Sequence, residues 1–565
     1  MIKNEQAQRS IAARAGWAIT TALASTLLFG VAGTSAAEAI LTMHIEEQTS
    51  WVQNFNPFDL AGRRQSTMDF IYEPLVIFNA EDGGKPVWRL ATSFKFSDDL
   101  KSITYELRPG LKWSDGKPLT SADVKFTYEY LKKFPALDFV SIWSFITGVE
   151  AVDGQTVRFT LKDPSSLAAE QLSQLPIVPE HIWKDVADPV TFANENPVGS
   201  GPLTEVPRFT GQTYDQCRNP NYWDAEHLKV DCMRFPQLAD NNQILTATAD
   251  GTLDWGVSFI PDIDNVYVSK DPDHYHYWYS PSSMVAFLFN LETGNEANKK
   301  AFNDVKFRRA VSMALDRKTM IDVAGYGYPT LNEDPGLMGE LYKSWADPSV
   351  KADFGKFAAY DADAAKALLD EAGYKDKDGD GFRDNPDGSK ISFTIIVPNS
   401  WTDWIDTVNI AIEGMQAVGI DAKIETPEEA VWTSDLIEGK FDAAINSLPA
   451  SSSPYYPYKR AFSASDKGKT RFTAQRWFSP EVEDLVTQFT HTADLDKQKD
   501  AMNKAQRIVA ENLPMIPVFN NPNWYQYNTK RFTGWSTKEN PFVNPSISRT
   551  NPARLLNLLA LEPVK

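Results

Sequence analysis

Residues 392–426, "SFTIIVPNSWTDWIDTVNIAIEGMQAVGIDAKIET", indicate the class of fold. Its start is rich in β-branched and aromatic residues, which predicts a strand over 392–398. The apolar spacing that follows predicts a helix over 404–418, and "DAKIET" (421–426) predicts a second strand. A further strand, "FDAAINS" (441–447), comes next along the chain. This order is β-α-β-like and is typical of an open α/β sheet, in which ligands bind at the carboxyl ends of strands.

Helices and strands alternate through the rest of the chain as well. One helix is expected to begin at Thr120, with Asp123 three residues on as its capping partner. Another is expected to begin at Asn303 or Asp304 and to continue through the segment 303–324, and a third to end at Gly373. A chain of 565 residues is too long for one core. The sequence therefore predicts an α/β fold with two or three lobes.

The N-terminus has the pattern of a secretory signal peptide. Lys3, Arg9 and Arg14 precede an apolar run from Ala15 to Gly33, and small residues follow. We expect residues 1–37 to be removed and the mature protein to be exported. The alternative is a membrane anchor; no other apolar run approaches the length of a bilayer span.

The net charge of −19 bears on the partners. An acidic surface repels nucleic acid backbones and anionic lipid headgroups, so neither is expected as a partner.

The two cysteines, Cys217 and Cys232, flank a short segment with turn residues at its centre. In an oxidising compartment this favours a disulfide, with free thiols or a metal site as the alternatives.

A run of aspartates resembles a calcium-binding loop. "YKDKDGDGFRDNPDGSK" (374–390) matches most of the pattern of alternating acids followed by glycine. The last position holds an aspartate, which is shorter than the usual glutamate, and a strand rather than a helix is expected downstream. We therefore expect either a structural calcium ion that stabilises the loop or a turn without a bound ion. The candidate ligands are Asp376, Asp378, Asp380, Asp384 and Asp387.

Four segments together resemble a known family. "WSDGKPLTSADVKFTYEYLKK" (113–133), "NPVGSGPL" (196–203), "FRRAVSMALDRKTMI" (307–321) and "GYKDKDGDGF" (373–382) are similar to signatures of bacterial extracellular solute-binding proteins of the peptide/nickel/oligosaccharide ABC importer class. Runs such as "CRNPNYWDAEHLKVDC" resemble the chitooligosaccharide- and cellobiose-binding branch.

The resemblance implies a three-domain periplasmic protein with two lobes around a ligand cleft and an extra domain on the first lobe. It implies a monomer that delivers its ligand to the permease subunits in the inner membrane. A further hypothesis, compatible with this one, is a binding protein that reports its ligand to a membrane sensor. No cofactor is expected besides the calcium already considered. The expected parts are the signal peptide (1–37), lobe I in three segments (38–70, 197–284 and 515–565), domain II (71–196) and the closing lobe III (285–514).

The resemblance also implies binding residues. Trp401 is expected to stack on a sugar ring, and Asp403 to accept hydroxyl hydrogen bonds, with a helix cap as its alternative role. Arg471 is expected to donate to the ligand, with a surface ion pair as the alternative. Gln53 and Ser447 depart from the pattern of the branch, where an arginine and an asparagine are expected. The remaining candidates are Trp51, Asn54, Ser258, Trp404, whose alternative is a core role, Asn446 and Phe472.

The predicted function is capture of β-linked oligosaccharides for import. The nearest alternative is a peptide receptor of the same class, which would favour an acid for the ligand's amine and a base for its carboxylate. A secreted glycoside hydrolase would need two carboxylates at a set separation. No G-x-S-x-G motif is present, and His274 and His276 are the only neighbouring histidines, so no enzyme is expected.

Overall fold

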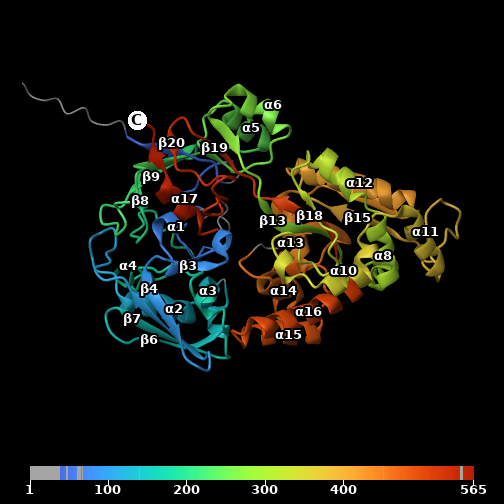
Figure 1. Cartoon of the computed structure of the whole chain (residues 1–565), viewed down its shortest axis with the longest axis horizontal. Helices are drawn as coiled ribbons and strands as arrows, with labels where there is room; N and C mark the ends of the chain where they lie inside the picture. The colour runs from blue at the N-terminus through green and yellow to red at the C-terminus, as the bar shows by residue number, and fades with distance from the viewer. Residues whose placement is uncertain are drawn as a thin grey trace, which may run out of the picture. The chain divides into compact units, whose positions relative to one another are not determined.

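The computed structural model describes residues 38–45, 49–59, 65, 68–138, 140–448, 451–547 and 551–565 (Figure 1). Residues Ala39–Lys565 form one unit, which is described here. The predicted signal peptide, residues 1–37, lies outside the described residues. Across the described ranges, no helix combines the length and the apolar character that a bilayer crossing requires.

A six-stranded mixed sheet contains the segment 392–426. The predicted strand–helix–strand order is confirmed, with helix α12 (Thr402–Ala417) beginning two residues earlier than expected. Strand β15 pairs in parallel with β16 and β17, whereas β13 runs antiparallel to β17 and β18. In sheet order the strands are β14 (Thr330–Leu331), β18 (Met515–Pro522), β13 (Pro281–Phe289), β17 (Ala443–Ser447), β15 (Ser392–Ile396) and β16 (Asp421–Glu425).

Helices cover both faces of this sheet, because its central strands are apolar on both sides. Phe287 and Ile445 point into one core and Ala286 and Ala444 into the other, as the two-residue period of a strand requires. The first core includes residues of α7 (Glu296–Asn303), α8 (Val305–Met313), α11 (Ala362–Glu371) and α12, and the second includes residues of α13 (Glu429–Glu438), α14 (Tyr455–Phe462), α15 (Pro480–Thr490) and α16 (Leu495–Asn512).

The helix expected over 303–324 is interrupted, and the reason is a buried arginine. Helix α8 ends at Met313, a short helix α9 spans Arg317–Thr319, and a π-helical turn follows at Met320–Ala324. The Arg317 side chain is buried and donates to the carbonyl oxygens of Pro517 (2.8 Å) and Ser312 (2.9 Å). A guanidinium buried among carbonyls needs free acceptors, and the open end of α8 supplies one of them.

A second body of sheets shares one large core built from residues 41–255 and 525–561. Its capped helix α2 (Ser121–Lys133) is confirmed, with the Thr120–Asp123 capping box in place. The sheets are β1–β10–β9–β8 (Ile40–Thr42, Cys232–Pro236, Thr213–Arg218 and Leu203–Phe209), β4–β5–β7–β6 (Ala91–Phe96, Ser102–Leu107, Thr156–Leu161 and Ile146–Ala151) and β11–β19–β12 (Trp255–Gly256, Gln526–Asn528 and Tyr275–Tyr277).

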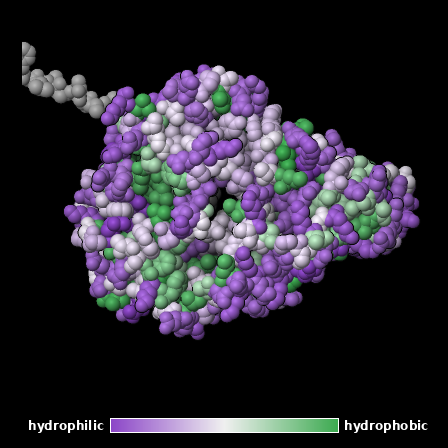
Figure 2. Space-filling view, viewed as in Figure 1, coloured by the Kyte–Doolittle hydropathy of each residue, from purple (hydrophilic) through white to green (hydrophobic). Residues whose placement is uncertain are grey.

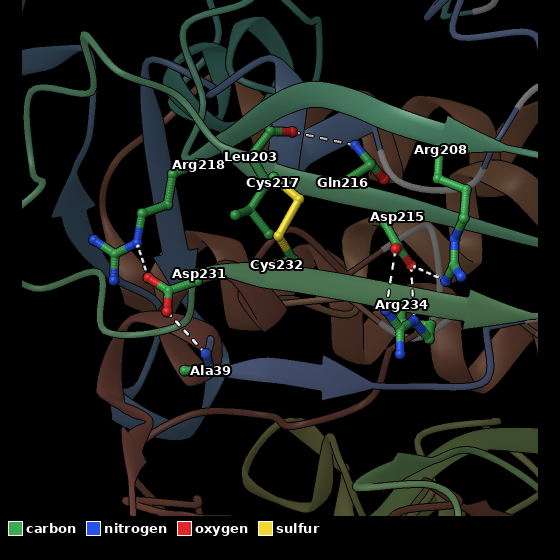
Figure 3. Close-up of a disulfide and its surroundings, with 10 residues drawn as sticks. All are labelled: Ala39, Leu203, Arg208, Asp215, Gln216, Cys217, Arg218, Asp231, Cys232 and Arg234. Carbon is green, nitrogen blue, oxygen red and sulfur yellow. Dashed lines mark hydrogen bonds and ion pairs between the residues drawn. A yellow bond between two sulfur atoms is a disulfide. The ribbon is translucent and has the colours of Figure 1, made fainter. Parts of the chain in front are cut away.

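The predicted disulfide is confirmed. Cys217 and Cys232 face each other on the neighbouring strands β9 and β10 and are bonded (Figure 3). Beside them, Asp215 accepts from Arg208 (2.8 Å) and Arg234 (2.9 Å), which ties β8, β9 and β10 together. The disulfide therefore reinforces the pairing of β9 and β10, which the ion pairs of Asp215 also stabilise.

Shorter elements complete the chain. They are α1 (Met68–Ile71), β2 (Val76–Asn79), β3 (Lys85–Trp88), α3 (Ala168–Leu172), α4 (Glu180–Trp183), α5 (Asn241–Ala249), α6 (Ile263–Val266), α10 (Pro348–Phe354), β20 (Phe532–Thr533), α17 (Arg554–Ala560), β21 (Glu562–Pro563) and the short turns η1 (Ala80–Asp82), η2 (Pro135–Leu137), η3 (Ile142–Ser144), η4 (Val268–Lys270), η5 (Met320–Ala324), η6 (Lys343–Trp345), η7 (Gly355–Phe357), η8 (Ala464–Asp466) and η9 (Arg471–Thr473).

Candidate functional site

One edge of the six-stranded sheet gathers the loops that follow its parallel strands. Strands β15, β17 and β18 run in the same direction, so their carboxyl ends lie at one edge, and β13 and β14 begin there. Figure 2 shows the surface hollowed between the elements around this sheet and those of the other core. Loops at such an edge are where open α/β sheets hold ligands. We call this edge the strand-end edge.

Trp401 lies at the strand-end edge after β15 and is the partly exposed member of a three-indole cluster. Its ring meets that of Trp404 edge-on at 4.8 Å and that of Trp432 at 5.3 Å between centroids. Trp404 and Trp432 are buried, 5% and 1% exposed, so Trp404 takes the core role that was its alternative. Trp432 was not predicted, because it lies in α13, far along the chain from "NSWTDW".

Arg471 is brought together with three other predicted residues. Its guanidinium donates to Asn446 Oδ1 and to Ser447 Oγ (3.4 Å) and lies 4.6 Å from the ring centre of Phe472. Asn446 Nδ2 donates back to the Arg471 carbonyl oxygen (2.9 Å). Burial lowers the pKa of Arg471 to about 10. In the described parts of the chain no carboxylate lies within ion-pair distance of Arg471, although the charge of Glu429 acts to raise its pKa, so the expected alternative of a surface ion pair is not seen there.

Asp403 lies in the first turn of α12, next to Trp401, and its carboxyl group is half-buried. Burial raises the pKa of Asp403 to about 7, and the nearby Asp406 charge adds to the rise. Trp401, rather than Asp403, occupies the cap position of the helix. Within the described ranges, no lysine, arginine or histidine forms an ion pair with the Asp403 carboxylate.

The candidates from the first lobe are placed in structural roles. The Trp51 ring is 5% exposed, and its indole N–H donates to the Phe235 carbonyl oxygen (3.1 Å), so it offers no free face for stacking. Gln53 donates to the Glu195 carbonyl oxygen (3.0 Å). Asn54 is buried and accepts from the backbone of a turn, and Ser258 is 5% exposed. The structure brings none of these side chains into contact with the Trp401 cluster.

The aspartate loop folds mainly through its own hydrogen bonds. The carboxylates of Asp376, Asp378 and Asp384 have oxygen atoms within 4.8 Å of one another. Asp380 pairs with Lys390, and Asp387 pairs with Lys300, so lysines already compensate two of the five expected ligands. Calcium at this loop stays a prediction.

Comparisons with known proteins identify the family. Residues 85–469 match the family described as "Bacterial extracellular solute-binding proteins, family 5 Middle". The "Probable peptide-binding protein YejA" of Agrobacterium fabrum is 24% identical, with 82% of each chain covered.

Two solved structures are similar. The mannohexaose-bound periplasmic oligopeptide-binding protein of Thermotoga maritima is 27% identical, with a TM-score of 0.81 over 93% of this chain and 99% of that one. The nonapeptide complex of AppA from Bacillus subtilis has a TM-score of 0.74 at 21% identity, over 93% of this chain and 99% of that one, and shows the fold alone.

The predicted family and α/β fold are therefore confirmed, whereas the narrower chitooligosaccharide and cellobiose branch finds no support in these relatives. The chain belongs to family 5 of the bacterial extracellular solute-binding proteins, the periplasmic binding components of ABC importers, and is not an enzyme.

Proposed function

We propose that this chain binds peptides at the strand-end edge, with the ligand's amino group at Asp403 and a carbonyl or carboxylate oxygen at Arg471. This replaces the oligosaccharide prediction as the first choice. The observation that carries the proposal is a half-buried acid and a half-buried base, each without an ion-pair partner in the described residues. Charges held out of water without a partner are unfavourable. The amino group of a peptide supplies the positive charge for Asp403, and a carbonyl or carboxylate oxygen of the peptide accepts from Arg471.

The relatives support the same class of ligand. YejA of Agrobacterium fabrum is named a probable peptide-binding protein, and the Thermotoga maritima structure is titled an oligopeptide-binding protein. The Trp401 face beside Asp403 would lie against the first side chains of the peptide.

Oligosaccharides are the second candidate, because the Thermotoga maritima protein holds mannohexaose. A partly exposed indole suits the apolar face of a sugar ring, and the side chains of Ser447 and Arg471 suit its hydroxyl groups. A sugar, however, leaves the charges of Asp403 and Arg471 without counter-ions.

We further propose that the predicted lobes describe how the ligand is enclosed. Residues 285–514 would close on lobe I (38–70, 197–284 and 515–565), on which domain II (71–196) packs, with β13 and β18 as the connecting strands. The chain would act as a monomer in the periplasm, after removal of residues 1–37, and deliver its ligand to the permease subunits.

Calorimetric titration separates the two ligand classes. The panel is tri- to pentapeptides, mannohexaose, chitotetraose and cellotetraose, each with the wild-type chain, Asp403→Asn and Glu413→Gln. Glu413 is the matched control because it lies in the same helix, is exposed and does not act on the pKa of Asp403. We expect peptide binding that Asp403→Asn weakens at least about tenfold and Glu413→Gln changes by less than about twofold. Binding of sugars alone would overturn the proposal.

A further inference from the structure

A second group of aromatic side chains lies at the same edge of the sheet and is not explained by the site around Trp401. Phe259 lies 5.4 Å from Trp524 and 5.9 Å from Tyr326 between ring centres. Tyr279 lies 4.9 Å from Trp524 and 5.1 Å from Tyr328. All five rings are at least partly exposed. We call Phe259, Tyr279, Tyr326, Tyr328 and Trp524 the second aromatic cluster.

The sheet topology places this cluster on the strand-end edge. Trp524 follows the end of β18, Tyr279 precedes the start of β13, and Tyr326 and Tyr328 precede the start of β14. Pro281 pairs with Pro522, and Thr330 pairs with Asn520, so these three points are neighbours in the sheet. Phe259 is contributed by the loop after β11, outside the six-stranded sheet. The cluster therefore combines side chains at the ends of β13, β14 and β18 with one side chain from the loop after β11.

The strand order also sets the distance to Trp401. Trp401 follows β15, and β15 is separated from β18 by β17 and β13. Three strand spacings of about 4.8 Å amount to about 14 Å along the edge. An extended peptide advances about 3.3–3.6 Å per residue. A chain whose amino end is at Asp403 thus reaches the second aromatic cluster at about its fourth or fifth residue.

Tyr326 is held in an unfavourable backbone conformation that presents its ring. Its φ is 53°, in the left-handed region that side chains rarely adopt, between Gly325 and Gly327. Tyr326 is 48% exposed, so little packing holds its side chain in this strained turn. Its neighbour Tyr328 is fixed, because its hydroxyl donates to the Ile260 carbonyl oxygen (3.2 Å) and accepts from Ile263 N (2.9 Å). Tyr328 is thus held in place within the cluster, and Tyr326 is open to solvent.

We propose that the second aromatic cluster is a side-chain subsite that selects peptides with an aromatic residue at about the fourth or fifth position from the amino end. This rests on the proposed peptide function. An aromatic side chain would lie edge-on or offset against Tyr326 and Trp524, the geometry that the rings of the cluster already adopt among themselves.

The test is a set of pentapeptides built of alanine, with one phenylalanine moved from position 1 to position 5, titrated into the full chain. Tyr326→Asn is the main variant, since asparagine tolerates the left-handed backbone while lacking the ring. Phe259→Ala is the second variant. Tyr360→Asn is the matched control, because Tyr360 is 53% exposed and lies outside the cluster.

We expect phenylalanine at position 4 or 5 to bind about tenfold tighter than phenylalanine at position 2, and Tyr326→Asn and Phe259→Ala to abolish this difference. Binding of the all-alanine peptide should change by less than about twofold. Equal affinity at every position, or a preference that survives both variants, would overturn the subsite alone. Failure of every peptide, including the all-alanine one, would overturn the proposed function and the subsite with it.

Discussion

The side chain of Ser452 donates a hydrogen bond to the carboxylate of Glu170, although 282 positions separate the two residues. The same two regions meet again where Ser166 N donates to the Thr490 carbonyl oxygen (2.8 Å) and where Gln498 Nε2 donates to Ser166 Oγ (3.3 Å). Glu170 lies in α3, and Ser452, Thr490 and Gln498 belong to the region of α14–α16. These bonds join predicted domain II to the predicted closing lobe.

Glu170 is expected to make this closing contact depend on pH. Burial raises the pKa of Glu170 in the joined state, so joining favours the protonated carboxyl group. The contact is therefore strongest below the ordinary pKa of a glutamate and weakens as the pH rises through the raised value. Small-angle X-ray scattering of the ligand-free chain should show a larger radius of gyration above that value.

Glu170→Gln mimics the protonated form and should give a compact chain at every pH, whereas Ser452→Ala should expand it. Glu226→Gln is the control, because Glu226 is an exposed glutamate with no ion pair among the described contacts. A radius that is unchanged in the wild type between pH 4 and 8 would contradict this prediction.

Asp403 should make peptide affinity depend on pH in the opposite direction. With a pKa of about 7 in the free chain, its ionised form falls as the pH drops below 7, and an ammonium group binds only that form. We expect affinity to fall by up to about tenfold per pH unit below 7 and proton release on binding at neutral pH. Calorimetry in two buffers of different ionisation enthalpy measures both. A flat profile in the wild type, matching that of Asp403→Asn, would argue against the ion pair.

The two neighbouring tryptophans should separate binding from stability. Trp401 is half-buried and packs against both cores of the sheet, so Trp401→Ala is expected to weaken ligand binding by about 1–3 kcal/mol with a smaller loss of Tm than Trp404→Ala. Trp404 is 5% exposed in a core, so Trp404→Ala should cost about 3–5 kcal/mol of unfolding free energy. Parallel titration and thermal unfolding of both variants decides between these roles, and a Trp401 variant that only unfolds would refute its binding role.

His44 should weaken the fold in mild acid. Its ring is buried, and burial lowers the pKa of His44 to about 4. The unfolded chain takes up the proton near pH 6.5 and the folded chain does not, so stability is lost as the pH falls from 6.5 towards 4. The loss amounts to roughly 3 kcal/mol. Urea unfolding of the wild type and of His44→Gln at pH 7 and pH 4.5 measures it; equal losses in both proteins would assign the acid sensitivity elsewhere.

Local patterns predicted the local structure well, because their causes are local. The strand–helix–strand order of 392–426, the capping box at Thr120 and the disulfide each depend on residues close in sequence. The helix break before Arg317 was missed because its acceptor, the Pro517 carbonyl oxygen, lies 200 positions away.

The site was predicted only in part for the same reason. Trp401, Asn446 and Ser447 follow or end strands that the sequence reveals, whereas Arg471 and Phe472 lie in η9 and were expected from the family resemblance. The second aromatic cluster depends on the pairing of β13, β14 and β18, which distant segments decide. Trp51 shows the converse, since its motif resembles a cleft residue while Tyr214 and Phe235 enclose it in a core.

In the proposed mode of binding Asp403 receives the amino end of a peptide, and N-acetylation removes the charge that it would bind. The measurement is calorimetric titration of the wild-type chain with one pentapeptide and its N-acetylated form at pH 7.5. We expect acetylation to lower the affinity at least about tenfold, because it removes the positive charge, and Asp403→Asn to bind both forms equally. Equal binding of the two forms by the wild type would contradict it.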